Sequence, residues 1–397
     1  MANKKSKYCR KLLSVFLLLL VVMTYGVIKA KEKHIFIWLP DYIRNGIVKL
    51  FEKENKNAPT EIMLIVVDHH EIKKSHKKEE EFIRRLRILS DRHMDSDGKK
   101  FQYTFFYVYD DFNLEVAKAI SSICAQGYGD MELHWHMANE TSESYRNKLK
   151  DAKKKFSEVG ALTTIEGKNA FAFIHGNWNL DNTPSISGSV SGVTDELDLL
   201  REEGCFADFT FPAFGEPSQP KIVNSIFYAL DDPRKPKSYD TGVPLEVGKP
   251  PIDDRYFMIF QGPMFIGMNL SNIFSGKRPF FIERGTLQDD DPPTPFRADE
   301  WVKHGVYIKG KPEWKFIKLH THGAMHPDAV LGEDMDKTLT HLEKKYNDGK
   351  KYRLHYVTAR EAYNIVKAAE AGLTGNPDNY RDYLIKKYKY TIFNRIP

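Results

Sequence analysis

The sequence has little cysteine and, outside its first residues, little net charge. Its 397 residues include three cysteines, so at most one disulfide can form within the chain. The formal net charge is +5, but residues 1–31 contribute +7 and contain no acid, which leaves −2 for the remainder. Because a nearly neutral body gives nucleic acid no electrostatic footprint, we expect no nucleic-acid partner. The content of 41% hydrophobic and 28% charged residues is typical of a globular protein with a buried core.

The N-terminus combines a basic stretch with an apolar run. Basic residues gather between positions 4 and 11, and residues 12–28 form an apolar run of roughly 17 residues, near the lower limit for a bilayer-spanning helix. The basic flank should stay in the cytoplasm, which places the rest of the chain in a periplasmic or extracellular space. Residues 28–30 make a poor cleavage site, so we expect 1–31 to be an uncleaved signal anchor that attaches the protein to the membrane. A cleaved signal peptide and secretion are the alternative.

Export also bears on the cysteines. Cys9 lies in the basic stretch, whereas Cys124 and Cys205 would share an oxidising compartment and could pair there. Their separation in the sequence does not show whether the geometry of a disulfide is met.

Strand-like apolar runs alternate with helical stretches along most of the chain. Such alternation implies a parallel sheet covered by helices. We expect residues 32–60 to be a linker and N-terminal extension, 61–372 the main domain and 373–397 a C-terminal tail. Within the main domain, 215–254 and 285–296 have weak periodicity and predict long surface loops or an inserted β-rich section. The predicted strands cover residues 61–67, 103–109, 131–136, 170–174, 206–211, 314–319 and 353–357.

Histidines and an aspartate follow several of these strands directly. The carboxyl ends of parallel strands meet at one rim, and alternate residues of a strand end point the same way. Imidazole and carboxylate together suit Zn²⁺ or a similar divalent metal, which would acidify a water molecule and polarise a carbonyl. The alternative is that these polar groups only form hydrogen bonds. The groups are Asp68-His69-His70, His134 with His136, His175, and His320 with His322.

The order of these motifs resembles the polysaccharide deacetylase (NodB-like) superfamily. The segment 65–69 resembles the family's first aspartate motif, and 130–139, with His134-Trp135-His136, is similar to its histidine motif. Residues 195–212 resemble the helix and strand before the substrate-facing loop. Residues 318–323 look like the late histidine motif, and 354–361 look like the last strand and helix. The resemblance spans roughly residues 60–372.

The resemblance implies an α/β fold of the distorted (β/α)7 TIM-like barrel type and a metal-dependent hydrolase that removes acyl groups from an envelope or exported polysaccharide. It makes Asp68, His134 and His136 the metal ligands and His320 or His322 the general acid. The chain departs from the family at His69, where the family has a second aspartate, and at Ala138, where it has its second histidine. Glu71 or His69 would then be the base. The residues expected to line a polysaccharide or oligosaccharide site are His175, Asn177, Asp181, Trp135 and Trp178, although both tryptophans are equally typical of a core.

Two other functions remain open at this level. A glycosidase would need paired carboxylates across a cleft, for which Glu71, Glu132 and Asp208 are candidates. A catalytically inactive glycan-binding or assembly protein would keep the fold without the chemistry.

Overall fold

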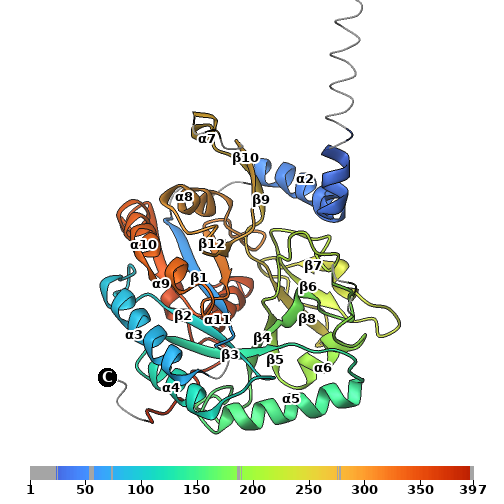
Figure 1. The fold of residues 1–397 in the computed structure, drawn as a ribbon. Coiled ribbons are helices and arrows are strands. Elements are labelled where there is room, and N and C mark those ends of the chain that lie inside the picture. Colours follow the sequence, from blue (N-terminus) through green and yellow to red (C-terminus); the bar gives the residue numbers. More distant parts are fainter. Residues whose placement is uncertain are drawn as a thin grey trace, which may run out of the picture.

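A computed structural model describes residue 24 and residues 26–52, 58–72, 75–185, 188, 190–274, 276 and 279–393 (Figure 1). The fold is mixed α/β, with one large and mostly parallel sheet. The strands are β1 Thr60–His70, β2 Tyr103–Val108, β3 Gly129–Trp135, β4 Phe171–His175, β5 Cys205–Asp208, β6 Ile226–Leu230, β7 Gly242–Pro244, β8 Tyr256–Phe260, β9 Phe265–Met268, β10 Phe280–Glu283, β11 Thr286–Leu287, β12 Trp314–Thr321 and β13 Tyr352–Tyr356. The helices are α2 Ile35–Phe51, α3 His76–Arg92, α4 Leu114–Ala125, α5 Ser142–Ser157, α6 Glu196–Glu202, α7 Ser271–Phe274, α8 Pro295–His304, α9 Pro327–Leu331, α10 Glu333–Tyr346 and α11 Ala359–Glu370.

The strand order of the large sheet is β11-β12-β1-β2-β3-β4-β5-β8-β6-β7, with β13 also paired to β1. β1 is the third strand of this order and pairs in parallel with β12, β2 and β13. β6 runs antiparallel to both β8 and β7. Within 215–254, which the sequence predicts to be long surface loops or an inserted β-rich section, the structure has the antiparallel strands β6 and β7 together with long connections.

The sheet is strongly curled, so that strands far apart in the order approach each other. The rings of Phe316 on β12 and Phe260 on β8 have centroids 5.8 Å apart. The Lys318 ammonium of β12 donates hydrogen bonds to the carbonyls of Phe209 at 2.5 Å and Phe211 at 2.6 Å, just beyond β5. The hydrogen-bonded path through the described strands nevertheless ends at β11 and β7 and does not close into a barrel.

Both faces of the central strands are buried, which explains their continuous apolar runs. Alternate residues of β1 belong to different cores: Leu64 and Val66 pack with α3, whereas Ile65 and Val67 face the inside of the curl. α11 contributes to the inner core and is held at its start by a capping box of Thr358. This alternation decides which side chains at the strand end reach the same space.

Residues 32–60 contain more than a linker, because α2 occupies 17 of them. Pro40 lies inside this helix and interrupts the pattern by which a helix is recognised in a sequence. The C-terminal segment is also part of the body. Tyr388 is 4% exposed and donates a hydrogen bond to Glu132, and Arg381 pairs with Asp95.

The predicted signal anchor, residues 1–31, lies outside the described residues apart from residues 24 and 26–31. Among the helices that the structure describes, none combines the length and apolar character needed to cross a lipid bilayer.

The possible disulfide between Cys124 and Cys205 is absent, and both thiols are free and buried. Cys124 lies on α4, which packs against β3, whereas Cys205 begins β5, on the far side of β4. Burial raises the pKa of both thiols well above the ordinary value. A buried and protonated thiol in an apolar setting is unreactive.

Candidate metal centre

Three strands carry histidines to one place at their carboxyl ends. His69 belongs to β1, His134 to β3, and His320 to β12, with His322 just beyond. His69 and His134 have ring centroids 4.8 Å apart, and His69 and His322 4.6 Å apart. The expected convergence of strand-end histidines is therefore present, within the curl of the sheet.

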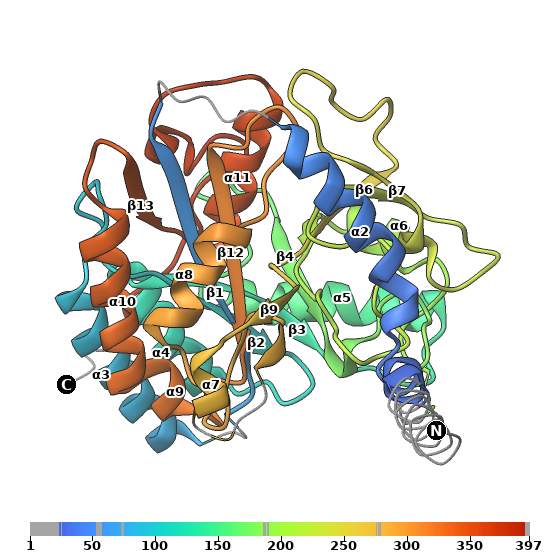
Figure 2. The ribbon, with the colours of Figure 1, turned by 90° about the horizontal axis from the view of Figure 1, so that it is seen from above.

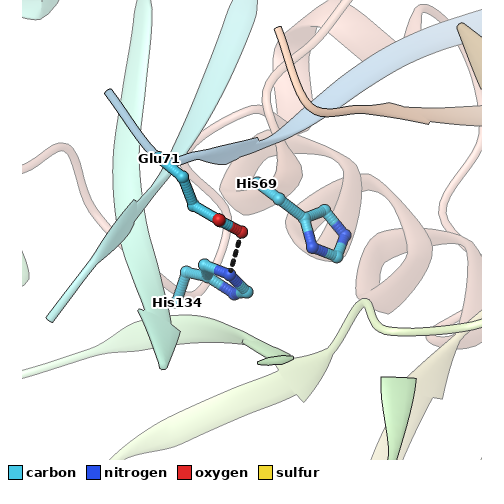
Figure 3. Close-up of side chains that lie close together, drawn as sticks. All are labelled: His69, Glu71 and His134. Carbon is cyan, nitrogen blue, oxygen red and sulfur yellow. Dashed lines mark hydrogen bonds and ion pairs between the residues drawn. The ribbon is translucent and has the colours of Figure 1, made fainter. Parts of the chain in front are cut away.

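The carboxylate of Glu71 lies among these imidazoles. Its Oε1 atom is 3.2 Å from Nε2 of His134, 3.4 Å from Nε2 of His136 and 3.9 Å from Nε2 of His322. Figure 3 shows Glu71 and His134 pointing toward each other beside His69. The ligand atoms of His69, Glu71 and His134 all lie within 4.8 Å of one another, so this group could hold a metal ion.

Contacts at Nδ1 fix the ring orientation of His134 and His136. Nδ1 of His134 donates to the carbonyl of Ile174 at 2.9 Å, and Nδ1 of His136 lies 3.2 Å from Oδ2 of Asp110. Asp110 also accepts a hydrogen bond from the backbone N–H of His136 at 3.0 Å. When Nδ1 carries the proton, Nε2 presents its lone pair to the centre, and metal-binding histidines in proteins are held in this way.

Gly176, at the start of the turn after β4, leaves room for His136 in this position. A Cβ atom built on Gly176 would lie 2.4 Å from Cδ2 of His136 and 2.8 Å from its Cα. A glycine is needed here because only a residue without a side chain lets the two segments approach so closely.

His69 is the most enclosed ligand candidate. It is 2% exposed, and its Nε2 atom has no hydrogen-bond partner among the described residues. Burial, followed by the nearby His322 and His134, lowers the pKa of His69 well below its ordinary value. A neutral imidazole with an unsatisfied buried nitrogen is the form that binds a metal, and such a nitrogen otherwise costs free energy.

The pKa values of Glu71 and His136 are both shifted by hydrogen bonds within the site. Burial alone would raise the pKa of Glu71, but hydrogen bonds from His134 and His136 outweigh it and lower that pKa. Burial alone would lower the pKa of His136, but Asp110 and Glu71 raise it to about 9. His136 therefore carries a proton at neutral pH that a metal ion would displace.

Asp68, predicted to be a metal ligand, belongs to a different network. Its Oδ2 lies 2.7 Å from Nδ1 of His70, and its Oδ1 accepts a hydrogen bond from the N–H of Gly323 at 2.6 Å. The other nitrogen of His70 lies 2.7 Å from Glu79 on α3. Because side chains alternate along a strand, Asp68 and His70 face α3 while His69 and Glu71 face the curl. The structure thus brings His69 and Glu71 to the centre instead of Asp68.

The late histidines line a pocket beside the centre. It has a volume of about 190 Å³ and is bordered by Trp178, Phe214, Arg284 and His322, among other residues. His320 is more deeply placed, with its Nε2 atom 2.6 Å from the hydroxyl of Thr286. Burial lowers the pKa of His322 and lowers that of His320 further. Trp178 is half-buried, and its ring lies 4.7 Å from that of His69.

The other residues predicted to line the site have different positions. Trp135 is 1% exposed on the opposite face of β3 and packs on Tyr145 of α5, so its ring is not available to a sugar. His175 is also turned away and lies 3.4 Å from Glu196 of α6. Asp181 is buried and accepts a hydrogen bond from the N–H of Ser238. Asn177 is exposed in the turn next to Trp178.

Three residues of the site were not recognised in the sequence. Asp110 lies two residues beyond β2 and directly follows the predicted strand 103–109, a strand-end position like those of the histidines, and this signal could have identified it. Thr286 lies within the segment 285–296 of weak periodicity and Arg284 directly precedes it, and nothing in that pattern indicates that the chain folds over the late histidines here.

A second group, Asp95, Asp97 and His355, also has ligand atoms within 4.8 Å of one another. It lies at the amino end of the sheet and contains its own cations. Arg381 is 2.9 Å from Asp95, and Arg353 is 3.6 Å from Asp97. Burial alone would lower the pKa of His355, but the carboxylates of Asp97 and Glu61, which lie against its ring nitrogens, raise it. A protonated imidazole and two guanidinium groups compete with a metal ion, so this group is better suited to an ion-pair network.

No protein-family model matches the chain, and the search of curated proteins finds no match either.

Proposed function

We propose that the protein is a metal-dependent hydrolase that removes acyl groups, N- or O-linked, from a glycan. The observation that carries the proposal is the convergence of three imidazole Nε2 atoms on one oxygen of Glu71, at 3.2, 3.4 and 3.9 Å. A carboxylate among several imidazoles at the carboxyl ends of parallel strands is the donor set that Zn²⁺ prefers. The curled sheet is consistent with a distorted, incompletely closed (β/α)7-type barrel.

The residues that would hold the metal are His69, Glu71 and His134, with His136 as a further imidazole. His69 supports this assignment because its buried nitrogen has no partner among the described residues. When bound, a divalent metal such as Zn²⁺ would acidify a water molecule and polarise the acyl carbonyl.

The remaining steps fall to residues of the pocket. His322, whose pKa burial lowers, is neutral near pH 7 and can accept the proton of the attacking water. The same imidazole can then deliver that proton to the nitrogen or oxygen that leaves as the acyl bond breaks. Trp178 offers a ring face to a sugar, and Arg284 adds a positive charge at the pocket wall.

The glycosidase alternative has less support. Glu132 is buried and bonded to Tyr388, and Asp208 is buried and bonded to Thr210. Neither of these carboxylates borders the pocket beside Glu71, so the pair that a glycosidase needs is not assembled from these candidates. A glycan-binding or assembly protein would use the same pocket without turnover.

The test is to load the full-length protein with Zn²⁺, count metal by mass spectrometry and measure acetate release from N- and O-acetylated oligosaccharides. We expect one equivalent of metal at this centre and its loss in His134→Ala, with activity at least about 100-fold lower. His341→Ala is the matched control, because His341 lies on α10 and pairs with Asp299. Asp97→Asn alters the second group, formed by Asp95, Asp97 and His355. We expect this variant to keep the one equivalent of metal at the candidate centre.

The outcomes separate the alternatives. Equally little metal in the wild type and in His134→Ala would refute the metal centre. An occupied centre without acetate release would refute deacylation and favour the binding or assembly protein.

A further inference from the structure

One apolar side of α2 faces away from the protein. Residues spaced three or four apart lie on one side of a helix, and here that side is exposed. The apolar side chains on it are at least half exposed: Phe36, Ile43 and Ile47 at 53%, Val48 at 50% and Phe51 at 80%. In a helix that only covers a core, such residues would face inward.

The opposite side of α2 fastens the helix to the body. Trp38 is fully buried and packs with Val223, Met264 and Phe214. Asp41 accepts a hydrogen bond from the N–H of Val223 at 3.0 Å. At the helix end, Glu52 accepts a hydrogen bond from the hydroxyl of Tyr307 at 2.7 Å. The exposed side is therefore held in a fixed orientation.

A second apolar element lies next to α2. The β9–β10 hairpin and α7 carry exposed apolar side chains, and their most exposed residue is Phe274, at 93%. Tyr42 of α2 accepts a hydrogen bond from the N–H of Ile266 at 3.2 Å, which joins the two elements. Figure 1 shows α2, β9, β10 and α7 at the top of the molecule, and Figure 2 looks down on α2, β9 and α7 from that side. The remaining exposed residues here are Ile266, Met268, Leu270, Ile273 and Phe280.

We propose that α2 and the β9–β10–α7 element together form a surface that rests in the interfacial layer of a phospholipid membrane. The sequence immediately before α2 contains the apolar run 12–28, which predicts a membrane segment leading directly to this surface. Lys31 and Lys33 are exposed at the start of α2, where they can meet anionic headgroups. An exposed apolar helix side flanked by basic residues is typical of interfacial membrane contact.

The membrane surface adjoins the pocket of the candidate metal centre. Phe214 borders the pocket and also packs against Trp38 of α2, and Arg284 of the pocket directly follows β10. The pocket therefore lies close to the bilayer. For the substrate, a consequence that rests on the proposed hydrolase function, this favours a glycan carried on or held at the membrane.

The experiment measures contact between the full-length protein and lipid, and it does not depend on an activity assay. In a Cys9→Ser background, Phe274→Cys is labelled with an environment-sensitive fluorophore, because the native Cys124 and Cys205 are 6% and 5% exposed. The protein is reconstituted into vesicles of phosphatidylethanolamine and phosphatidylglycerol. Quenching by a lipid with a nitroxide near its headgroup is compared with quenching by aqueous iodide. Ile165→Cys is the control, since Ile165 is 61% exposed and precedes β4 at the amino end of the sheet.

We expect the label at Phe274 to be quenched several-fold more by the lipid nitroxide than by iodide, and the label at Ile165 to show the reverse. Phe274 is decisive because it lies on α7, outside α2 and the N-terminal run, so its quenching reports on the β9–β10–α7 element itself. Iodide quenching at Phe274 equal to that at Ile165 would overturn the proposal. Protection from both quenchers, with energy transfer between differently labelled chains, would assign the surface to a second copy and also overturn it. Neither result depends on hydrolase activity.

Discussion

Asp68→Asn separates the two networks that meet at the end of β1. In the wild type, His70 is fully buried between Asp68 and Glu79, with 2.7 Å to each carboxylate. Burial alone would lower the pKa of His70, but Glu79 and Asp68 raise it from the ordinary 6.5 to about 10. At about 1.36 kcal/mol for each tenfold change in proton affinity, this corresponds to about 5 kcal/mol, shared by two carboxylates. We therefore expect Asp68→Asn to lower the free energy of unfolding by roughly 2–3 kcal/mol.

The sign of the pH dependence follows from the direction of the shift. A group whose pKa is raised on folding stabilises the protein fully below its unfolded pKa of 6.5, and this contribution is lost as the pH rises through about 10. The stability difference between wild type and Asp68→Asn should thus be largest below pH 6.5 and shrink toward pH 10. Urea unfolding, followed by circular dichroism at several pH values, measures it.

The same variant tests the composition of the metal centre. Because Asp68 faces α3, we expect Asp68→Asn to retain its metal, whereas Glu71→Gln loses metal with a smaller loss of stability. Glu71 is partly exposed, and no buried ion pair with α3 depends on it. If Asp68→Asn loses metal as fully as His134→Ala and unfolds like the wild type, the assignment is refuted and Asp68 is a ligand.

Further predictions concern the shape of the site and the core. Gly176→Ala should weaken metal binding by about 10-fold or more, since its Cβ would displace His136; metal titration measures this, and unchanged affinity would contradict it. Trp135→Ala should lower the free energy of unfolding by about 3–5 kcal/mol because the ring fills the core against Tyr145. Trp178→Ala should instead raise KM with little change in the free energy of unfolding. If Trp135→Ala raised KM and Trp178→Ala lowered the free energy of unfolding, Trp135 would be the sugar-binding residue and Trp178 the core residue. Reductant should leave the melting temperature unchanged, since the two buried cysteines are free.

Much of the sheet could be read from local patterns. Continuous apolar runs such as 61–67 and 103–109 are buried on both faces, and this property is visible in the sequence without a partner. α2 was missed because Pro40 interrupts it and because apolar residues lie on both of its sides, with Trp38 on the buried side and Ile43 on the exposed side. The inserted antiparallel strands were only partly foreseen, because their pairing with β8 joins segments that are distant in the chain.

For the site, the sequence by itself determined that several strands end in histidines. It also determined that His134 and His136 point to one side, as do His320 and His322, because alternate side chains of a strand lie on the same face. It did not determine which of Asp68 and His69 faces the centre, since a buried strand offers two apolar faces of equal character. That choice was made by α3, whose Glu79 binds His70 on one face, and by the curl of the sheet, which gathers His69, Glu71 and His134 on the other. Contacts between distant segments made this decision, and no local pattern encodes them.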